Sequence, residues 1–273
     1  MGAGHKRVRA PKGGVVIAVS HAAARGATGN CEQEPLDERG DRPHDPSLLC
    51  PEPAAGYLGR RYSEDGLFQS ERGNTIVCHP VAGSATEAAL LAARQRFLNM
   101  PDAHKLAFTA PESLHMTLFE GVLDRNRALP FWPHDVAIDT PLERMTEIFQ
   151  ARLAGFEPGP RFAVEVTGAA PIGLRLQGAT AEDRYAMADW RNRLSELLGL
   201  RQPNHDHYEF HSTFAYPIAW LDDQALPDWQ AMLDAVVTDL RAAAPVLELR
   251  APALCVFEDM NWFEEVLVLE PRA

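Results

Sequence analysis

The order of predicted strands and helices constrains the fold of this chain more than any other feature. From about Gly56 onward, short β-rich runs alternate with longer segments of helical periodicity. The order strand, helix, strand, helix, strand occurs twice, although no strict sequence repeat accompanies it. Such a recurrence of element order indicates a pseudo-duplicated fold.

The predicted segments are short and are separated by proline, glycine or charged residues. Helices between strands are also typical of a doubly wound parallel sheet. Here the strands are few and half polar, and the sequence has no glycine-rich phosphate loop, so we predict the α+β class. The predicted helices cover residues 84–99, 141–153, 181–198 and 228–240, and the predicted strands cover 74–78, 113–122, 161–167, 172–176, 207–215, 247–257 and 263–269.

Residues 1–55 differ in composition from the rest of the chain. They are rich in glycine, alanine, arginine and proline, and they contain no acidic residue before Glu32. We therefore predict a flexible or disordered leader over 1–55, followed by the folded domain over 56–273. The apolar run over 15–19 is too short for a membrane span or for the centre of a signal peptide. We predict a cytoplasmic protein that does not bind membranes.

Net charge and cysteine content limit the partners. The net charge is −12, and an acidic protein repels long polyphosphate backbones, so we expect no binding to long duplex nucleic acid. A small nucleotide, or an RNA end held by a local pocket, is compatible with this charge. We expect a monomer without a cofactor. The four cysteines show no paired spacing, which predicts free thiols rather than a zinc site.

The first candidate for chemistry is the sequence L-H-M-T-L-F, which lies in a predicted strand. Because side chains alternate between the two faces of a strand, His115 and Thr117 point to the same side. Leu114, Met116 and Leu118 point to the other side and form an apolar face. A single strand histidine is more often structural than catalytic, so this motif alone decides nothing.

The second candidate, F-H-S-T-F, repeats this arrangement in the other half of the chain. His211 and Thr213 share one face of the predicted strand, and Phe210 and Phe214 lie on the other. Ser212 makes that second face less apolar than in the first motif. Two His-x-Thr motifs, each in the second strand of its half, are hard to explain by packing alone, so we favour function.

Paired histidines and threonines suit cleavage of a phosphodiester. The reaction needs a base for the attacking oxygen and an acid for the leaving oxygen. Histidine titrates near neutrality, so one imidazole can be neutral while the other is protonated. The threonine hydroxyls can donate hydrogen bonds to the non-bridging oxygens, where negative charge builds up in the transition state. This chemistry requires no metal ion.

The two motifs resemble the signature of the 2H phosphoesterase superfamily. This superfamily includes RNA 2′,5′-ligase-type enzymes, cyclic nucleotide phosphodiesterases and the nuclease that trims the end of spliceosomal RNA. The segments G-N-T-I-V-C-H, L-H-M-T-L-F-E-G and E-F-H-S-T-F-A-Y are similar to an uncharacterised bacterial branch. The likeness extends from about Gly56 to the C-terminus.

The resemblance implies a fold, an activity and a set of catalytic residues. The fold has two pseudo-symmetric lobes, each an antiparallel sheet backed by helices, with a central cleft. The activity is hydrolysis of a cyclic phosphodiester, such as a 2′,3′-cyclic nucleotide or an RNA end, or the reverse ligation. The family's catalytic residues correspond to His115, Thr117, His211 and Thr213.

Four further residues are candidates for substrate binding. Tyr216 could stack on a base or bind the phosphate, but strict alternation puts it opposite Thr213 unless the strand contains a bulge. His79 and Asn74 lie on the first predicted strand and could line the cleft, although exposure at the surface fits them equally well. Arg127 follows the first motif in a loop, where an arginine could meet an anion or simply be solvated.

Two other functions fit the sequence. His205, His207, Glu209 and His211 lie at alternating positions in a run that resembles the metal-binding motif of metallo-β-lactamase-type hydrolases. This run departs from that motif in its last step, and side chains two residues apart on one strand diverge. The second alternative is a non-catalytic module that binds a nucleotide or an RNA end in the same cleft.

Overall fold

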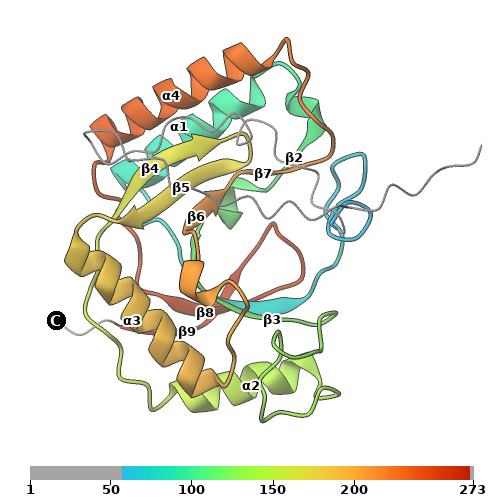
Figure 1. Cartoon of the computed structure of the whole chain (residues 1–273), viewed down its shortest axis with the longest axis vertical. Helices are drawn as coiled ribbons and strands as arrows, with labels where there is room; N and C mark the ends of the chain where they lie inside the picture. The colour runs from blue at the N-terminus through green and yellow to red at the C-terminus, as the bar shows by residue number, and fades with distance from the viewer. Residues whose placement is uncertain (1–56, 271–273) are drawn as a thin grey trace, which may run out of the picture. The chain divides into compact units, whose positions relative to one another are not determined.

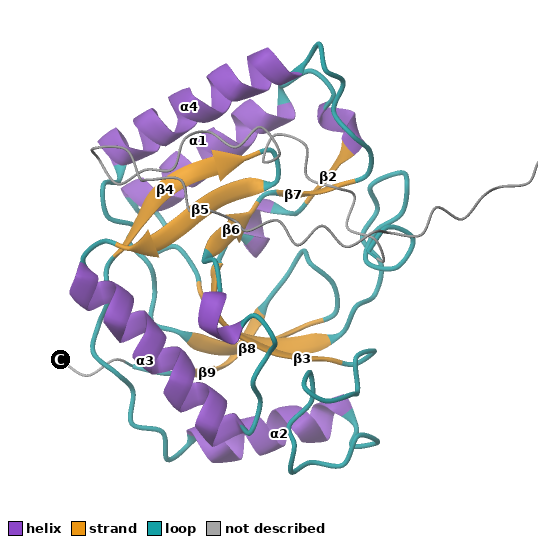
Figure 2. Ribbon diagram, viewed as in Figure 1, coloured by secondary structure: helices purple, strands orange, loops and turns teal. Residues whose placement is uncertain are grey.

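The computed structural model describes residues 57–270, which form an α+β fold of four α-helices and three antiparallel sheets (Figures 1 and 2). The predicted fold class is therefore confirmed. The leader predicted over 1–55 lies outside the described residues, and its flexibility stays a prediction. No helix within 57–270 is long and apolar enough to cross a membrane.

The largest sheet has four strands in the order β3-β1-β8-β9. Its strands are β1 (Gly73–Cys78), β3 (Met116–Leu123), β8 (Ala253–Phe257) and β9 (Glu264–Val268). All neighbouring strands in this sheet pair antiparallel. Every residue of β1 is buried, because this strand is paired on both edges and covered on both faces.

The second motif lies in one of two smaller sheets. One contains β4 (Val164–Ala170), β5 (Gly173–Gly178) and β6 (His211–Thr213), and the other pairs β2 (Leu106–Phe108) with β7 (Ala215–Pro217). β6 and β7 are nearly continuous in sequence, so the chain passes directly from one small sheet to the other. Phe214, the residue between them, is fully buried.

The helices cover these sheets from outside. They are α1 (Ala85–Leu98), α2 (Leu142–Leu153), α3 (Ala181–Leu198) and α4 (Leu226–Ala243). Figure 1 shows α1 and α4 side by side; α4 also packs against β4, whereas α3 packs against β5, β3 and α2. The Ser84 hydroxyl caps α1, and Thr180 with Asp183 forms a capping box at the start of α3, which explains where these helices begin.

Large aromatic side chains fill the core between helices and sheets. Trp132, Trp190 and Trp229 are all buried. Each indole N–H donates to a main-chain carbonyl, as in the 2.8 Å bond from Trp229 Nε1 to the oxygen of Pro101, so burial leaves no indole unpaired. All three side chains therefore belong to the core.

The strands that were predicted to carry the two motifs are shorter than expected. The strand predicted over 113–122 begins at Met116, because residues Pro111–Ser113 form a 3₁₀ turn and His115 lies just before the strand. The strand predicted over 207–215 contains only β6 and the start of β7, because His205–His207 form another 3₁₀ turn. A 3₁₀ turn thus precedes each motif, with one residue between the turn and the motif histidine in the first and three residues in the second.

The prediction of free thiols is confirmed for the two cysteines within the described residues. Cys78 and Cys255 are buried and unpaired, and burial raises the pKa of both. Cys31 and Cys50 lie outside the described residues.

Candidate active site

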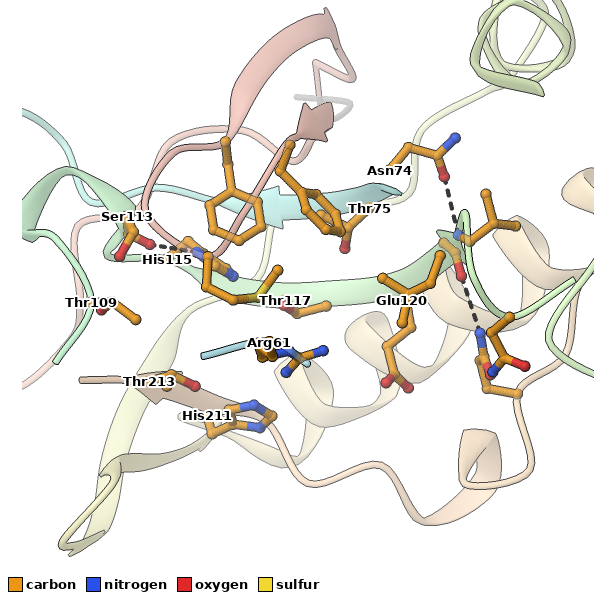
Figure 3. Close-up of a pocket in the computed structure, with 18 of the residues that line it drawn as sticks. Arg61, Asn74, Thr75, Thr109, Ser113, His115, Thr117, Glu120, His211 and Thr213 are labelled. Carbon is orange, nitrogen blue, oxygen red and sulfur yellow. Dashed lines mark hydrogen bonds between the residues drawn. The ribbon is translucent and has the colours of Figure 1, made fainter. Parts of the chain in front are cut away.

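One pocket contains all four residues of the two His-x-Thr motifs. Thr117 lies on β3 of the four-stranded sheet and His115 just before that strand, whereas His211 and Thr213 come from β6 of a different sheet (Figure 3). The pocket has a volume of about 260 Å³. This value lies just below the usual range of roughly 300–1,000 Å³ for small-molecule sites, so the pocket suits a small ligand or one end of a larger one.

The main chain fixes the orientation of the His115 ring. Its Nδ1 lies 2.6 Å from the carbonyl oxygen of Ser113, and a carbonyl can only accept a hydrogen bond. Nδ1 must therefore carry the hydrogen, and in the neutral ring Nε2 is left with a free lone pair. The ring also packs on Phe263, with 4.2 Å between ring centroids, which restricts its rotation.

His211 repeats this arrangement on the other sheet. Its Nδ1 lies 2.8 Å from the carbonyl oxygen of Glu209, again two residues earlier in the chain. The same argument assigns the hydrogen to Nδ1 and leaves Nε2 free in the neutral ring. His211 is exposed, unlike His115, and its ring lies 6.0 Å from that of Tyr208. The two imidazoles thus share one tautomer but differ in their access to water.

Electrostatics distinguishes His115 further. Burial lowers the pKa of His115 to about 3, since the imidazolium would be poorly solvated there, and the nearby rings of His79 and His211 lower it too. The hydrogen bond to Ser113 acts in the opposite direction but is outweighed. His115 is therefore neutral at physiological pH, which is the form that a general base needs.

This lowered pKa predicts how stability depends on pH. Between about pH 6.5 and pH 3 the unfolded chain protonates this histidine and the folded chain does not, so acidification favours unfolding. We expect the titration of His115 to lower the free energy of unfolding by up to about 1.4 kcal/mol for each pH unit of acidification in this window. His115→Asn cannot titrate at this position, so its free energy of unfolding, measured with urea, should fall less between pH 6.5 and pH 4.5 than that of the unmodified protein. An equal fall in the two proteins would contradict the prediction.

The two threonines are held by the pairing of their strands. Thr117 lies opposite Val77 of β1. Thr213 lies opposite Gly173 of β5. A Cβ at Gly173 would come within 2.1 Å of the carbonyl oxygen of Ser212, and its φ of +149° is one that other residues rarely adopt. Glycine there permits the close approach that places Thr213.

Tyr216 lines the same pocket because the chain contains the required irregularity. The main-chain N–H groups of Phe214 and Ala215 both donate to the carbonyl oxygen of Ile172, at 2.8 and 3.1 Å. Two consecutive donors to one acceptor form a bulge, which shifts the alternation by one residue. Tyr216 consequently faces the same pocket as Thr213.

The other three candidates for substrate binding have structural contacts. Asn74 borders the pocket, but its side-chain amide donates to Thr146 Oγ1 and accepts from Val122 N, both at 3.2 Å. His79 does not line the pocket; its Nδ1 lies 3.2 Å from the carbonyl oxygen of Leu114. Arg127 does not line it either.

Arg127 instead organises the loop that follows β3. Its guanidinium bonds Asp124 and the carbonyl oxygens of Ile138 and Thr140, and it lies over the ring of Trp132, 4.8 Å from the centroid. These contacts use most of its donors. An anion-binding function for Arg127 has no geometric support.

Comparisons with known proteins place this architecture in a family. A family model described as 2H-phosphodiest, a domain of unknown function (DUF1868), matches residues 61–175. The crystal structure of ATU0111, a conserved protein of unknown function from Agrobacterium tumefaciens strain C58, matches with 49% identity and a TM-score of 0.77. The match covers 78% of this chain and 92% of that one. The chain belongs to the 2H-phosphodiest family. No curated protein matches it significantly.

Membership in the 2H-phosphodiest family confirms the resemblance that the two motifs indicate. The residues matched by the family model include His115 and Thr117 but end before His211 and Thr213. The second motif is therefore tied to the first by geometry, through the shared pocket and the shared Nδ1 arrangement. Family membership by itself assigns no substrate.

Sequence reasoning missed several pocket residues that this 2H-phosphodiest chain brings to the site. Arg61 lies over the rings of Tyr57 and Tyr216, at 4.2 and 5.2 Å from their centroids, and pairs with the buried Glu71. Arg125 binds the same carboxylate. Arg61 and Tyr57 precede the first regular strand in a segment without periodicity, so no local pattern could indicate them.

The alternative metal site over His205, His207 and His211 does not form within the described residues. Within residues 57–270, no group of three or more His, Cys, Asp or Glu side chains is placed to hold a metal ion. His205 is buried, with Nε2 3.0 Å from Asn192 Oδ1, and burial lowers its pKa to about 4. Because residues His205–His207 form a 3₁₀ turn, they do not alternate as they would on a strand.

Proposed function

We propose that this chain is a phosphodiesterase that hydrolyses a cyclic phosphodiester, such as a 2′,3′-cyclic nucleotide or an RNA end, without a metal ion or cofactor. The observation that supports this most is the pair of imidazoles in one pocket. Each donates its Nδ1–H to a main-chain carbonyl and keeps Nε2 available for proton transfer. Two imidazoles with two hydroxyls supply the groups that in-line displacement at phosphorus needs.

The environments of the two histidines suggest their roles. Neutral His115 takes a proton from water at Nε2 as the water oxygen bonds to phosphorus. His211, which is exposed, donates a proton to the 2′ or 3′ oxygen as the bond from that oxygen to phosphorus breaks. Thr117 and Thr213 donate hydrogen bonds to the non-bridging oxygens. The reverse ligation uses the same groups with acid and base exchanged.

We also propose the two-lobed arrangement that the family resemblance implies. In support, the first motif of the pocket lies at the start of β3 in the four-stranded sheet, and the second motif lies on β6 of the three-stranded sheet. The proposal further includes a leader over 1–55, a domain over 56–273 and a monomer that acts in the cytoplasm. The net charge of −12 favours a small nucleotide or an RNA end over long nucleic acid.

The experiment that tests this function is hydrolysis of 2′,3′-cyclic mononucleotides by the purified protein in excess EDTA. We expect turnover to persist in EDTA, because the proposed acid, base and hydroxyls all come from side chains. The double variant His115→Ala, His211→Ala should lose it. Product analysis would show whether the 2′ or the 3′ bond to phosphorus is broken.

Each of the other outcomes has a clear meaning. Turnover that EDTA abolishes and zinc or manganese restores would overturn the metal-independent mechanism. Binding of the cyclic nucleotides without turnover would favour the alternative function, a module that holds a nucleotide or an RNA end.

A further inference from the structure

A bulge in β3 turns Glu120 toward the same side as the first motif. Along this strand Thr117 pairs with Val77 and Phe119 with Ile76, so Leu118 is an extra residue without a partner. Leu118 and Phe119 are consequently both buried, and the alternation shifts by one position. Glu120 therefore lines the pocket with Thr117, and Figure 3 shows its carboxylate pointing inward from the strand.

One oxygen of the Glu120 carboxylate, Oε2, is buried and left without a hydrogen-bond donor among the described residues. The charge of Arg191 lies close enough to interact with this carboxylate. Two polar side chains of the same pocket bond main-chain oxygens instead: Thr75 Oγ1 donates to the oxygen of Phe119, and Gln202 Nε2 donates to the oxygen of Gly121. A buried acceptor without a donor costs about 1–3 kcal/mol, and more when it is charged, so this carboxylate suits a ligand that brings a donor.

The position of Glu120 limits which part of a ligand it can meet. A carboxylate repels phosphate, so the phosphate belongs at the end of the pocket that holds the two histidines and threonines. Thr117 and Glu120 are separated by three residues of extended chain, about 7–10 Å. This separation resembles the reach of a nucleoside from its ribose phosphate to the edge of its base.

We propose that Glu120 determines substrate specificity by accepting hydrogen bonds from the paired N–H donors of a guanine base. This inference rests on the proposed function and names its substrate class. A carboxylate offers two acceptors side by side, and guanine offers two adjacent donors, N1–H and the N2 amino group. In adenine, cytosine and uracil, every ring-edge donor lies beside an acceptor, which a carboxylate would repel.

The walls of the pocket suit a flat base. Tyr57 and Tyr216 line it, and the Arg61 guanidinium lies over both of their rings. Tyr208, on the side of the second motif, lines it too. Proteins hold single nucleotides by stacking bases on tyrosine rings or guanidinium planes while polar side chains bind the base edges. Glu120 would supply the edge contact here.

The test compares ratios of kcat/KM rather than single rates. For the unmodified protein we expect 2′,3′-cyclic GMP to be preferred over 2′,3′-cyclic AMP by about tenfold or more, as for a bidentate base contact. Glu120→Gln should reduce this ratio by about tenfold or more, because an amide offers one donor and one acceptor, which match adenine. Glu120→Ala should lower turnover of the guanine substrate without improving that of adenine.

Controls separate specificity from a general loss of activity. Glu196→Gln removes an exposed carboxylate on α3 and should leave the ratio unchanged. 2′,3′-Cyclic IMP lacks the N2 amino group, so the unmodified protein should turn it over less well than the guanine substrate. The proposal would be overturned if Glu120→Gln lowered kcat/KM by the same factor for all bases, or if the unmodified protein showed no preference for the guanine substrate.

A binding measurement keeps this inference separate from the proposed catalysis. Calorimetric titration of the His115→Ala, His211→Ala double variant with 2′,3′-cyclic GMP and 2′,3′-cyclic AMP reports base preference without turnover. We expect the double variant to bind the guanine nucleotide more tightly, and Glu120→Gln to remove that difference. If this holds while the unmodified protein hydrolyses neither nucleotide, the specificity proposal stands and the catalytic proposal fails. Equal binding of both nucleotides would overturn the specificity proposal.

Discussion

Replacing His115 with alanine is expected to lower kcat for a cyclic phosphodiester by about 10²–10⁴-fold, the usual effect of removing a general acid or base. The ring is held between the Ser113 carbonyl and Phe263, and it is neutral because burial lowers its pKa to about 3. Water can still react in the variant, but no positioned base takes its proton. Steady-state kinetics at pH 7 measures the effect, and His211→Ala should show a loss in the same range.

A matched control distinguishes lost chemistry from lost structure. His104 is exposed in the 3₁₀ turn before β2 and does not line the pocket, so His104→Ala should retain full activity. Thermal unfolding of each variant would show whether it is folded. A decrease of less than threefold for both His115→Ala and His211→Ala in folded protein would contradict paired acid and base catalysis.

Thr117→Val is expected to lower kcat by about 10²–10³-fold with a smaller change in KM. Valine has nearly the shape of threonine but no hydroxyl, so the variant loses one donor to the non-bridging oxygens. Loss of a single such donor to a developing anion has effects of this size. The change concentrates in kcat because the hydrogen bond strengthens as charge builds up in the transition state. Thr213→Val should behave similarly.

Two comparisons test whether the hydroxyl is responsible. Thr117→Ser keeps the hydroxyl and should recover most of the activity, whereas a packing effect would not be restored by this smaller residue. Thr238→Val removes a hydroxyl on α4 that donates to the Asp234 carbonyl and does not line the pocket, so it should have no kinetic effect. A Thr117→Val variant with unchanged kcat and raised KM would assign the residue to binding alone.

The helices could be predicted closely because their signals are local. The helix predicted over 181–198 has those bounds in α3, where the capping side chain of Thr180 stands at one end and Gly199, with φ of +68°, at the other. α2 begins one residue later than predicted, with Pro141 at its cap position. Periodicity sets the buried face of such a helix, and capping sets its ends.

The strands and the pocket were less predictable because they depend on contacts between distant segments. β2 has only three residues and pairs with β7, more than a hundred residues later, so no pattern within it could indicate a strand. The bulge that turns Glu120 into the pocket exists only in the pairing of β3 with β1. Alternation correctly placed His115 with Thr117 and His211 with Thr213, but it could not locate a bulge or bring Arg61 to their side.

The hydrogen bonds that orient the two histidines have a consequence for how this site can vary between relatives. In both cases the acceptor is a peptide carbonyl, which residues of any type provide. Ser113 and Glu209, chemically unlike, perform the same task here. Mutations at these two positions can therefore accumulate without rotating either ring, provided that the path of the backbone persists. A search for distant members of this family should accordingly leave the residue two positions before each motif histidine unspecified, because only its main-chain carbonyl is needed.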